Sequence, residues 1–430
     1  MHDALKLPEI LLEIFSHLRE DGSSLCSIIR VNKQWFQLGT SIIWRDCSKS
    51  ESSKEALFFR ILGGIPGKRR FLYISKIRAL STSAKENRSP MFSSHPSDMN
   101  ITTVLLRDYN KMTSLQHFSR FMQTALRELE LCLCLINRYL MRRLSERCPQ
   151  LQKLRIIECL MDGSLSLQEF LERLPAVKSI HFSSSENLLN SDTLSYLARR
   201  KNLEDLTLDG SVDDGALAKA SARVKDPFPA IQSLNVNADS LNLPILMPMV
   251  RTVRKLSLFS LHSSVDNTLQ HVSKLTELRD LTLCLSYADR NCTREGLMSL
   301  TPLSNLERLN ISQPKCFIYM GVDMSHESVF SSEEFEEFIS CFPRLRYLEI
   351  DRPFGSINTR ALLSIAKHCT EINSLHRISV AHLSKDLKIL STECGPIMTN
   401  LRELGVTCYP PSAQDEEGVR SRRTKRWKHA

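Results

Sequence analysis

The sequence predicts an α/β protein in which a small N-terminal helical domain is followed by a curved solenoid of short parallel strands and helices. Two observations lead to this fold class. A short apolar phrase recurs along most of the chain at a nearly constant step, whereas residues 5–46 carry apolar side chains at helical spacing. Between the two regions, residues 81–100 are rich in Ser and Pro and predict an exposed loop.

The phrase consists of an apolar residue, two variable residues, an apolar residue, one variable residue and a last apolar residue. Successive phrases start 22 to 39 residues apart, and most steps lie between 25 and 30. The phrases begin at Leu126, Leu151, Val177, Leu203, Ile231, Val253, Leu278, Leu306, Leu345, Leu375 and Leu401, with a weaker one at Ile77. The longest step, from Leu306 to Leu345, predicts an insertion at 316–332.

Each phrase has the pattern of a short strand with one buried face, because its fourth and sixth residues point to the same side. Helical patterns lie between phrases, at 165–174, 192–200, 333–342 and 359–369. One such repeat cannot bury its own apolar face, so neighbouring repeats must stack. A doubly wound α/β domain is the alternative fold, but its buried parallel strands would read as continuous apolar runs. Here every strand interleaves polar residues.

The segment 7–18, LPEILLEIFSHL, predicts a helix with two apolar stripes. The stripes are Ile10, Ile14 and Leu18, and Leu7, Leu11 and Phe15. A unit of about 40 residues buries too little surface to be stable alone, so this apolar excess predicts a partner protein. The alternative is a helical cap that seals the first repeat.

Residues 7–46 resemble an F-box. The resemblance rests on the opening Leu7-Pro8, on Val31, Lys33 and Trp35 at the family's spacing, and on the closing Trp44; Asn32 stands where the family usually has Cys. The repeats resemble cysteine-containing leucine-rich repeats. The fuller consensus is visible in Leu126, Leu129, Leu131, Cys134, Ile136 and in Leu151, Leu154, Ile156, Cys159, Met161, while the other repeats are degenerate.

Together, the two resemblances imply a substrate receptor of an SCF-type cullin–RING ubiquitin ligase. In that family the F-box docks on the cullin adaptor, the repeats hold a protein substrate, and the receptor is not an enzyme but brings the substrate close to the conjugating enzyme. The implied domains are 1–46 (F-box), 47–100 (connecting helix, first irregular repeat and exposed loop), 101–409 (solenoid) and 410–430 (basic flexible tail). The alternative function is a leucine-rich-repeat scaffold that recruits no ligase.

The resemblance also implies two sets of contact residues. By family position, the adaptor contacts are expected at Leu7, Pro8, Ile10, Leu11, Ile14, Val31 and Trp35, with Trp35 partly in the motif's own core. Substrate contacts are expected on the concave face of the solenoid, from the third and fifth places of the phrases. They include Glu128, Glu130, Lys153, Arg155, Asp205, Lys255, Arg308 and Tyr347. No metal or cofactor is expected.

Composition narrows the function further. No apolar run approaches the roughly 18 residues of a membrane span, and no signal peptide is apparent, so a cytoplasmic or nuclear location is expected. The 13 cysteines form no C-x-x-C motif and predict reduced, buried thiols. Enzyme motifs such as G-x-S-x-G, the P-loop and H-E-x-x-H are absent from the sequence.

The net charge of +9 is concentrated in the tail. Residues 418–430 hold six Lys and Arg and no acid, which leaves the rest of the chain near +3. Nucleic-acid binding by the body is therefore not expected. Three interpretations of the tail remain open: a nuclear localisation signal, an unspecific electrostatic contact and a solubilising terminus.

Overall fold

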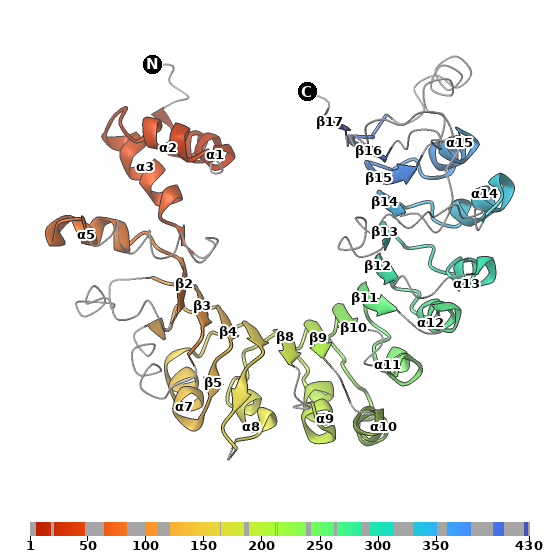
Figure 1. Ribbon diagram of the computed structural model, residues 1–430, viewed down its shortest axis with the longest axis horizontal. Helices are drawn as coiled ribbons and strands as arrows, with labels where there is room; N and C mark the ends of the chain where they lie inside the picture. The colour runs from red at the N-terminus through yellow and green to blue at the C-terminus, as the bar shows by residue number, and fades with distance from the viewer. Residues whose placement is uncertain are drawn as a thin grey trace, which may run out of the picture. The chain divides into compact units, whose positions relative to one another are not determined.

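The computed structural model describes residues 6–18, 21–47, 64–83, 100–109, 121–163, 165–184, 189–210, 212, 214–237, 242–261, 265–285, 293–312, 330–350, 359–379, 399–407 and 425–428. The chain folds as two compact units, residues 1–188 and 189–430. Within each unit the repeat strands lie side by side, and the repeat helices lie on the other side of the layer (Figure 1). This confirms the predicted order of a small helical domain followed by a leucine-rich-repeat solenoid.

The first unit begins with three helices, α1 (Pro8–His17), α2 (Gly22–Ile28) and α3 (Lys33–Ile43). Side-chain caps start the second and third of them. The Asp21 carboxylate accepts the Ser23 and Ser24 amides, and bonds from Ser24 and Ser23 lower the pKa of Asp21 to about 2. Asn32, the departure from the family's usual Cys, accepts the Trp35 amide at 2.9 Å. The departure therefore supplies the N-cap of α3.

Repeats of the first unit form a parallel sheet in the order β1, β2, β3, β4, β6, β8. The strands are Asp46–Cys47, Ala79–Ser83, Thr103–Arg107, Glu128–Cys132, Lys153–Ile157 and Ser179–Ser184, and the short β5 (Leu135–Ile136) pairs with β7 (Leu160–Met161). The helices are α5 (Gly67–Ile74), α7 (Arg138–Arg147) and α8 (Leu167–Glu172).

The second unit continues with β9 to β16, again parallel between paired neighbours. Its strands are Asp205–Gly210, Ser233–Asn237, Lys255–Leu261, Asp280–Leu285, Arg308–Ser312, Tyr347–Ile350, Ser374–Ser379 and Glu403–Thr407. Its helices are α9 (Ser191–Arg199), α10 (Asp214–Arg223), α11 (Leu243–Met249), α12 (Val265–Val272), α13 (Arg294–Met298), α14 (Ser332–Ser340) and α15 (Thr359–His368).

One backbone interaction recurs at the start of nearly every strand. The carbonyl of the residue before a strand accepts two consecutive amides from the next repeat; for example, Arg127 O accepts Gln152 N at 2.8 Å and Lys153 N at 2.9 Å. We call this residue the rung residue. The rung residues that make or accept this interaction are Arg45, Arg78, Thr102, Arg127, Gln152 and Lys178 in the first unit, and Glu204, Gln232, Arg254, Arg279, Glu307, Arg346, Asn373 and Arg402 in the second.

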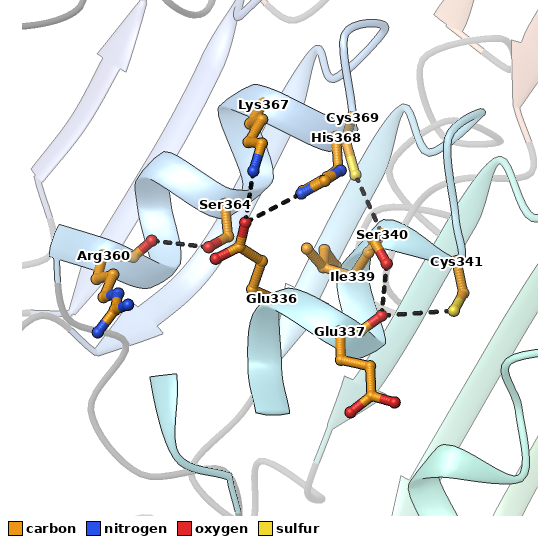
Figure 2. Close-up of polar contacts among 10 residues, drawn as sticks. All are labelled: Glu336, Glu337, Ile339, Ser340, Cys341, Arg360, Ser364, Lys367, His368 and Cys369. Carbon is orange, nitrogen blue, oxygen red and sulfur yellow. Dashed lines mark hydrogen bonds and ion pairs between the residues drawn. The ribbon is translucent and has the colours of Figure 1, made fainter. Parts of the chain in front are cut away.

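Helices of neighbouring repeats are joined by ion pairs on the other side of the layer. In the second unit the Glu336 carboxylate of α14 accepts Lys367 Nζ at 2.8 Å and lies 3.3 Å from His368 Nε2, both of α15 (Figure 2). These bonds lower the pKa of Glu336. Below them, the Cys369 thiol donates to the carbonyls of Ile339 and Phe342. Polar helix faces and buried thiols therefore connect consecutive repeats.

The structure corrects the repeat assignment at two places. A repeat begins at Ile101, with Val104 and Leu106 buried on β3, between the predicted repeats at Ile77 and Leu126. Near the other end, Leu375 is in register with Leu348 and not with Leu345, so this repeat begins at Ile372. The phrase at Leu375 was misread because the register shifts between Leu375 and Ile378.

Parts of three predicted segments lie outside the described residues. They are 84–99 of the expected loop at 81–100, 316–329 of the expected insertion at 316–332, and 410–424 with 429–430 of the expected tail. Residues 81–83 belong to β2. Residues 425–428 form β17, which pairs antiparallel with β16, from Glu403 opposite Lys428 to Val406 opposite Lys425.

Candidate functional site

Helix α1 keeps part of its apolar surface exposed. Leu7, Ile10 and Ile14 are 52%, 42% and 39% exposed and recur three and four residues apart on one side of the helix. We call these three residues the α1 stripe. Pro8, also expected as an adaptor contact, is exposed in the first turn. An unsatisfied apolar stripe on a domain this small is a feature of docking surfaces.

The other side of α1 forms the core of the helical domain. Leu11 and Phe15 are 0% exposed and pack with Leu25 of α2 and Ile42 of α3. Leu11 was expected among the adaptor contacts, but the structure places it inside this core. Because α1 faces α2 and α3 on the Leu11–Phe15 side, only the adjacent stripe remains on the surface.

Trp35 occupies an intermediate position. Its half-buried side chain packs against the core, with the Phe15 ring edge-on at a centroid distance of 5.4 Å. Its buried Nε1 has no hydrogen-bond partner among the described residues. Trp35 therefore supports the domain from within, as the sequence suggested in part.

Val31 is 52% exposed just before α3. The side chain of Gln34, in the first turn of α3, donates to the Lys6 carbonyl at 2.8 Å. This bond ties the start of α3 to the chain segment that leads into α1. Val31 and Leu7 thus lie at the end of the domain where these two helices begin.

The helical domain is joined to the repeats by shared backbone and side-chain contacts. Arg45, directly after α3, is the first rung residue: its carbonyl accepts Arg78 N at 2.9 Å and Ala79 N at 3.0 Å, and β1 pairs with β2. The Tyr73 ring of α5 lies 5.1 Å from the Trp44 ring and 6.3 Å from the Phe36 ring. The exit of the helical domain is therefore the first strand of the sheet.

The expected substrate-face residues of the first unit form two ion pairs across β4 and β6. Lys153 Nζ lies 2.9 Å from Glu128 Oε1, and Arg155 Nη1 lies 3.2 Å from Glu130 Oε2. In both pairs the side chains remain partly exposed on the strand face. Opposite charges on adjacent strands thus balance each other, and the pairs define no charge preference for a ligand.

In the second unit, Arg308 and Tyr347 lie together on β13 and β14. The Arg308 guanidinium stacks over the Tyr347 ring at 3.8 Å, and Arg308 Nε lies 3.6 Å from Asp280 Oδ2. The ring of His376 lies 5.2 Å from that of Tyr347, and His376 Nε2 lies 3.2 Å from Glu403 Oε2. Burial raises the pKa of Asp280, against the opposing charges of Arg308 and Lys255.

This row was only partly visible in the sequence. The predicted Arg308 and Tyr347 are brought together, whereas the predicted Asp205 and Lys255 stand exposed on β9 and β11. His376 was missed because the repeat at Ile372 was read three residues out of step. With the corrected phrase, His376 falls at the fifth place of its strand, where a substrate-face residue is expected.

Among the described residues, no group of three or more His, Cys, Asp or Glu side chains is arranged to hold a metal ion. Cys134 and Cys159 occupy equivalent buried positions in consecutive repeats and bond to the carbonyls of Leu106 and Leu131. Burial raises the pKa of Cys148 to about 12. None of the helices within the described ranges combines the length and apolar character required to cross a bilayer.

A compact helical domain followed by stacked strand-and-helix repeats defines a leucine-rich-repeat protein with an N-terminal docking module. Residues 8–50 match the family model described as F-box-like. The chain thus contains an F-box-like domain in front of a leucine-rich-repeat solenoid, an architecture for protein–protein interaction.

Solved structures share the fold at low sequence identity. A chain of the yeast Rad7–Elc1 complex is 14% identical, with 85% of this chain and 87% of that chain covered and a TM-score of 0.40. An internalin from Listeria monocytogenes is 13% identical, with 80% and 85% covered and a TM-score of 0.37. A Bacteroides fragilis protein is 13% identical, with 60% and 83% covered and a TM-score of 0.37. No curated protein matches the chain.

Proposed function

We propose that this protein is the substrate receptor of an SCF-type ubiquitin ligase. The F-box-like domain docks on the cullin adaptor, and the solenoid holds a protein substrate. The chain performs no chemistry; it raises the local concentration of the substrate at the ubiquitin-loaded enzyme. The observation that carries this proposal is the exposed α1 stripe on a domain whose family model matches the F-box.

The α1 stripe supports docking on energetic grounds. Leu7, Ile10 and Ile14 lie on the surface although the domain has a core of its own, so covering them stabilises a complex. Burying three such side chains contributes roughly 1.5–3 kcal/mol each before the costs of association. Val31 and Pro8 extend the same surface. Leu11 and Trp35 hold the stripe in place from inside the domain.

The proposal is tested by binding of the purified cullin adaptor to the full-length chain. Leu7→Asp combined with Ile14→Asp should weaken binding by at least about 100-fold, because two apolar contacts are lost and two charges are buried. Both positions are exposed, so the variant should keep its helical content and its melting temperature.

Leu160→Asp is the matched control. Leu160 is 51% exposed on β7 in the repeats, so the substitution introduces the same charge at similar exposure. The control should bind the adaptor as the unmodified chain does. If the adaptor fails to bind the unmodified chain, or binds the Leu7/Ile14 variant equally well, the ligase role is wrong. A scaffold that recruits no ligase then becomes the better interpretation.

A further inference from the structure

The two units carry opposite charge once the tail is set aside. Residues 1–188 hold 27 Lys and Arg against 19 Asp and Glu, whereas residues 189–417 hold 24 against 29. The small net charge of the body therefore conceals a basic first unit and an acidic second one. A charge asymmetry of this size indicates that one unit faces a charged partner.

The basic residues of the first unit include a row at the rung positions. Four of its six rung residues are cations, Arg45, Arg78, Arg127 and Lys178, and none is a carboxylate. We call these four residues the basic row. Arg45 and Lys178 are exposed, and the other two are half-buried. Consecutive rungs are about 4.8 Å apart, so the row extends over roughly 24 Å along the edge where the strands begin.

Part of the row is oriented by neutral acceptors. Arg127 Nη1 lies 3.4 Å from the Gln150 carbonyl, and Arg78 Nη1 donates to the Ser75 carbonyl at 2.8 Å. Arg147, exposed in the last turn of α7, stands three residues before Gln150. Neither Arg45, Arg78 nor Arg127 has a carboxylate partner within the described ranges.

The same position in the second unit behaves differently. There Arg279 Nη1 lies 3.2 Å from Glu307 Oε1, and Arg346 lies 3.6 Å from Glu307 Oε2 and 2.7 Å from Glu371 Oε2. Rung cations of the second unit are thus neutralised by acids on neighbouring rungs. Because the repeat geometry is shared, the unpaired charge of the basic row is a property of its sequence and is not imposed by the fold.

We propose that the basic row binds an acidic, extended segment of a partner protein, at a surface separate from both the α1 stripe and the strand face. An extended polypeptide advances about 3.4 Å per residue, so roughly seven residues match the length of the row. Cations spaced along such a segment pair with alternate carboxylates. An acidic polypeptide fits better than a nucleic acid, because no aromatic side chain stands among the rung residues to stack on bases.

The test measures binding of fluorescein-labelled peptides to the full-length chain by anisotropy. The probe is a peptide that alternates Glu and Ser, and its counterpart alternates Lys and Ser. To remove the contribution of the tail, every Lys and Arg of residues 420–428 is first replaced by Gln. In this background the acidic peptide should bind, the basic peptide should not, and the affinity should fall as salt rises.

Replacing Arg45, Arg78, Arg127 and Lys178 by Gln should weaken binding of the acidic peptide about tenfold, since each exposed ion pair contributes modestly. The matched control replaces the second unit's rung cations Arg254, Arg279, Arg346 and Arg402 by Gln, which removes the same charge. It should leave the affinity within about twofold. Melting temperatures of both variants establish that each is folded.

Three outcomes would overturn the proposal. The acidic peptide fails to bind the tail-neutralised chain, the two sets of substitutions weaken it equally, or a single-stranded oligonucleotide of equal charge binds more tightly than the peptide. Adaptor binding is measured on the same variants and should be unchanged, because the α1 stripe is intact in all of them.

Discussion

Individual residues of α1 separate packing from docking more sharply than their sequence pattern does. Leu11 and Ile10 are adjacent in sequence, yet Leu11 is 0% exposed and Ile10 is 42% exposed. Two apolar stripes were evident from periodicity, but periodicity does not say which stripe a neighbouring helix covers. Phe15 settles this at the residue scale, because its ring packs on Trp35 of α3 and orients α1.

Leu11→Ala should therefore destabilise the helical domain, by about 2–5 kcal/mol, because it leaves a cavity in a core with few other members. Ile10→Ala should change stability by less than about 0.5 kcal/mol, because Ile10 lies on the surface. Hydrogen exchange of the α1–α3 amides, read by mass spectrometry, measures both. Equal protection loss in the two variants would contradict this assignment of core and surface.

At the element scale, α5 connects the helical domain to the repeats. Its Tyr73 ring packs against Trp44, the last aromatic side chain of the F-box-like region, and against Phe36. The neighbouring Leu72 is 53% exposed. Aromatic pairs at such distances contribute about 0.5–1.5 kcal/mol beyond their buried area. The orientation of the domain on the sheet thus depends on this contact as well as on the pairing of β1 with β2.

We expect Tyr73→Ala to increase hydrogen exchange in α5 and in the last turn of α3, because both aromatic contacts are lost. Adaptor affinity should stay the same, since the α1 stripe and the Leu11–Phe15 core are not involved. Leu72→Ala is the control and should leave exchange unchanged. An exchange increase that spreads through all of α1 and α2 would show that the domain cannot hold its fold without α5.

At the scale of the whole molecule, the repeats contact only their neighbours, and stability is therefore a sum of local terms. Leu309 of β13 is 0% exposed and lies in register with Leu281 and Leu348. Leu309→Ala should increase exchange in β12, β13 and β14 and progressively less in more distant strands. Adaptor binding should not change. Uniform loss of protection from β2 to β16 would mean that the chain unfolds as one cooperative block instead.

The distribution of charge also belongs to this scale. Counting charges along the chain assigns the excess to the tail and leaves the body near +3. Dividing the body into its two units shows that this figure combines a basic first unit with an acidic second one. The rung residues then explain where part of the basic charge lies, because they come from six separate repeats and meet only when the strands align.

The sequence alone determined the fold class, the F-box-like region and most repeats, because these are encoded in short-range apolar spacing that any strand or helix must obey. Ile101, Val104 and Leu106 carried the same spacing, so that repeat was recoverable although it was missed. Ile372 was not, because a register shift in β15 breaks the phrase.

Only the tertiary structure decided which apolar residues of α1 face outward, that Arg45 is the first rung of the sheet, and that the rung cations are unpaired in the first unit but paired with Glu307 and Glu371 in the second. The physical reason is the same in each case. These properties depend on contacts between residues a full repeat or a full helix apart, and local spacing carries no information about which side chains such contacts bring together.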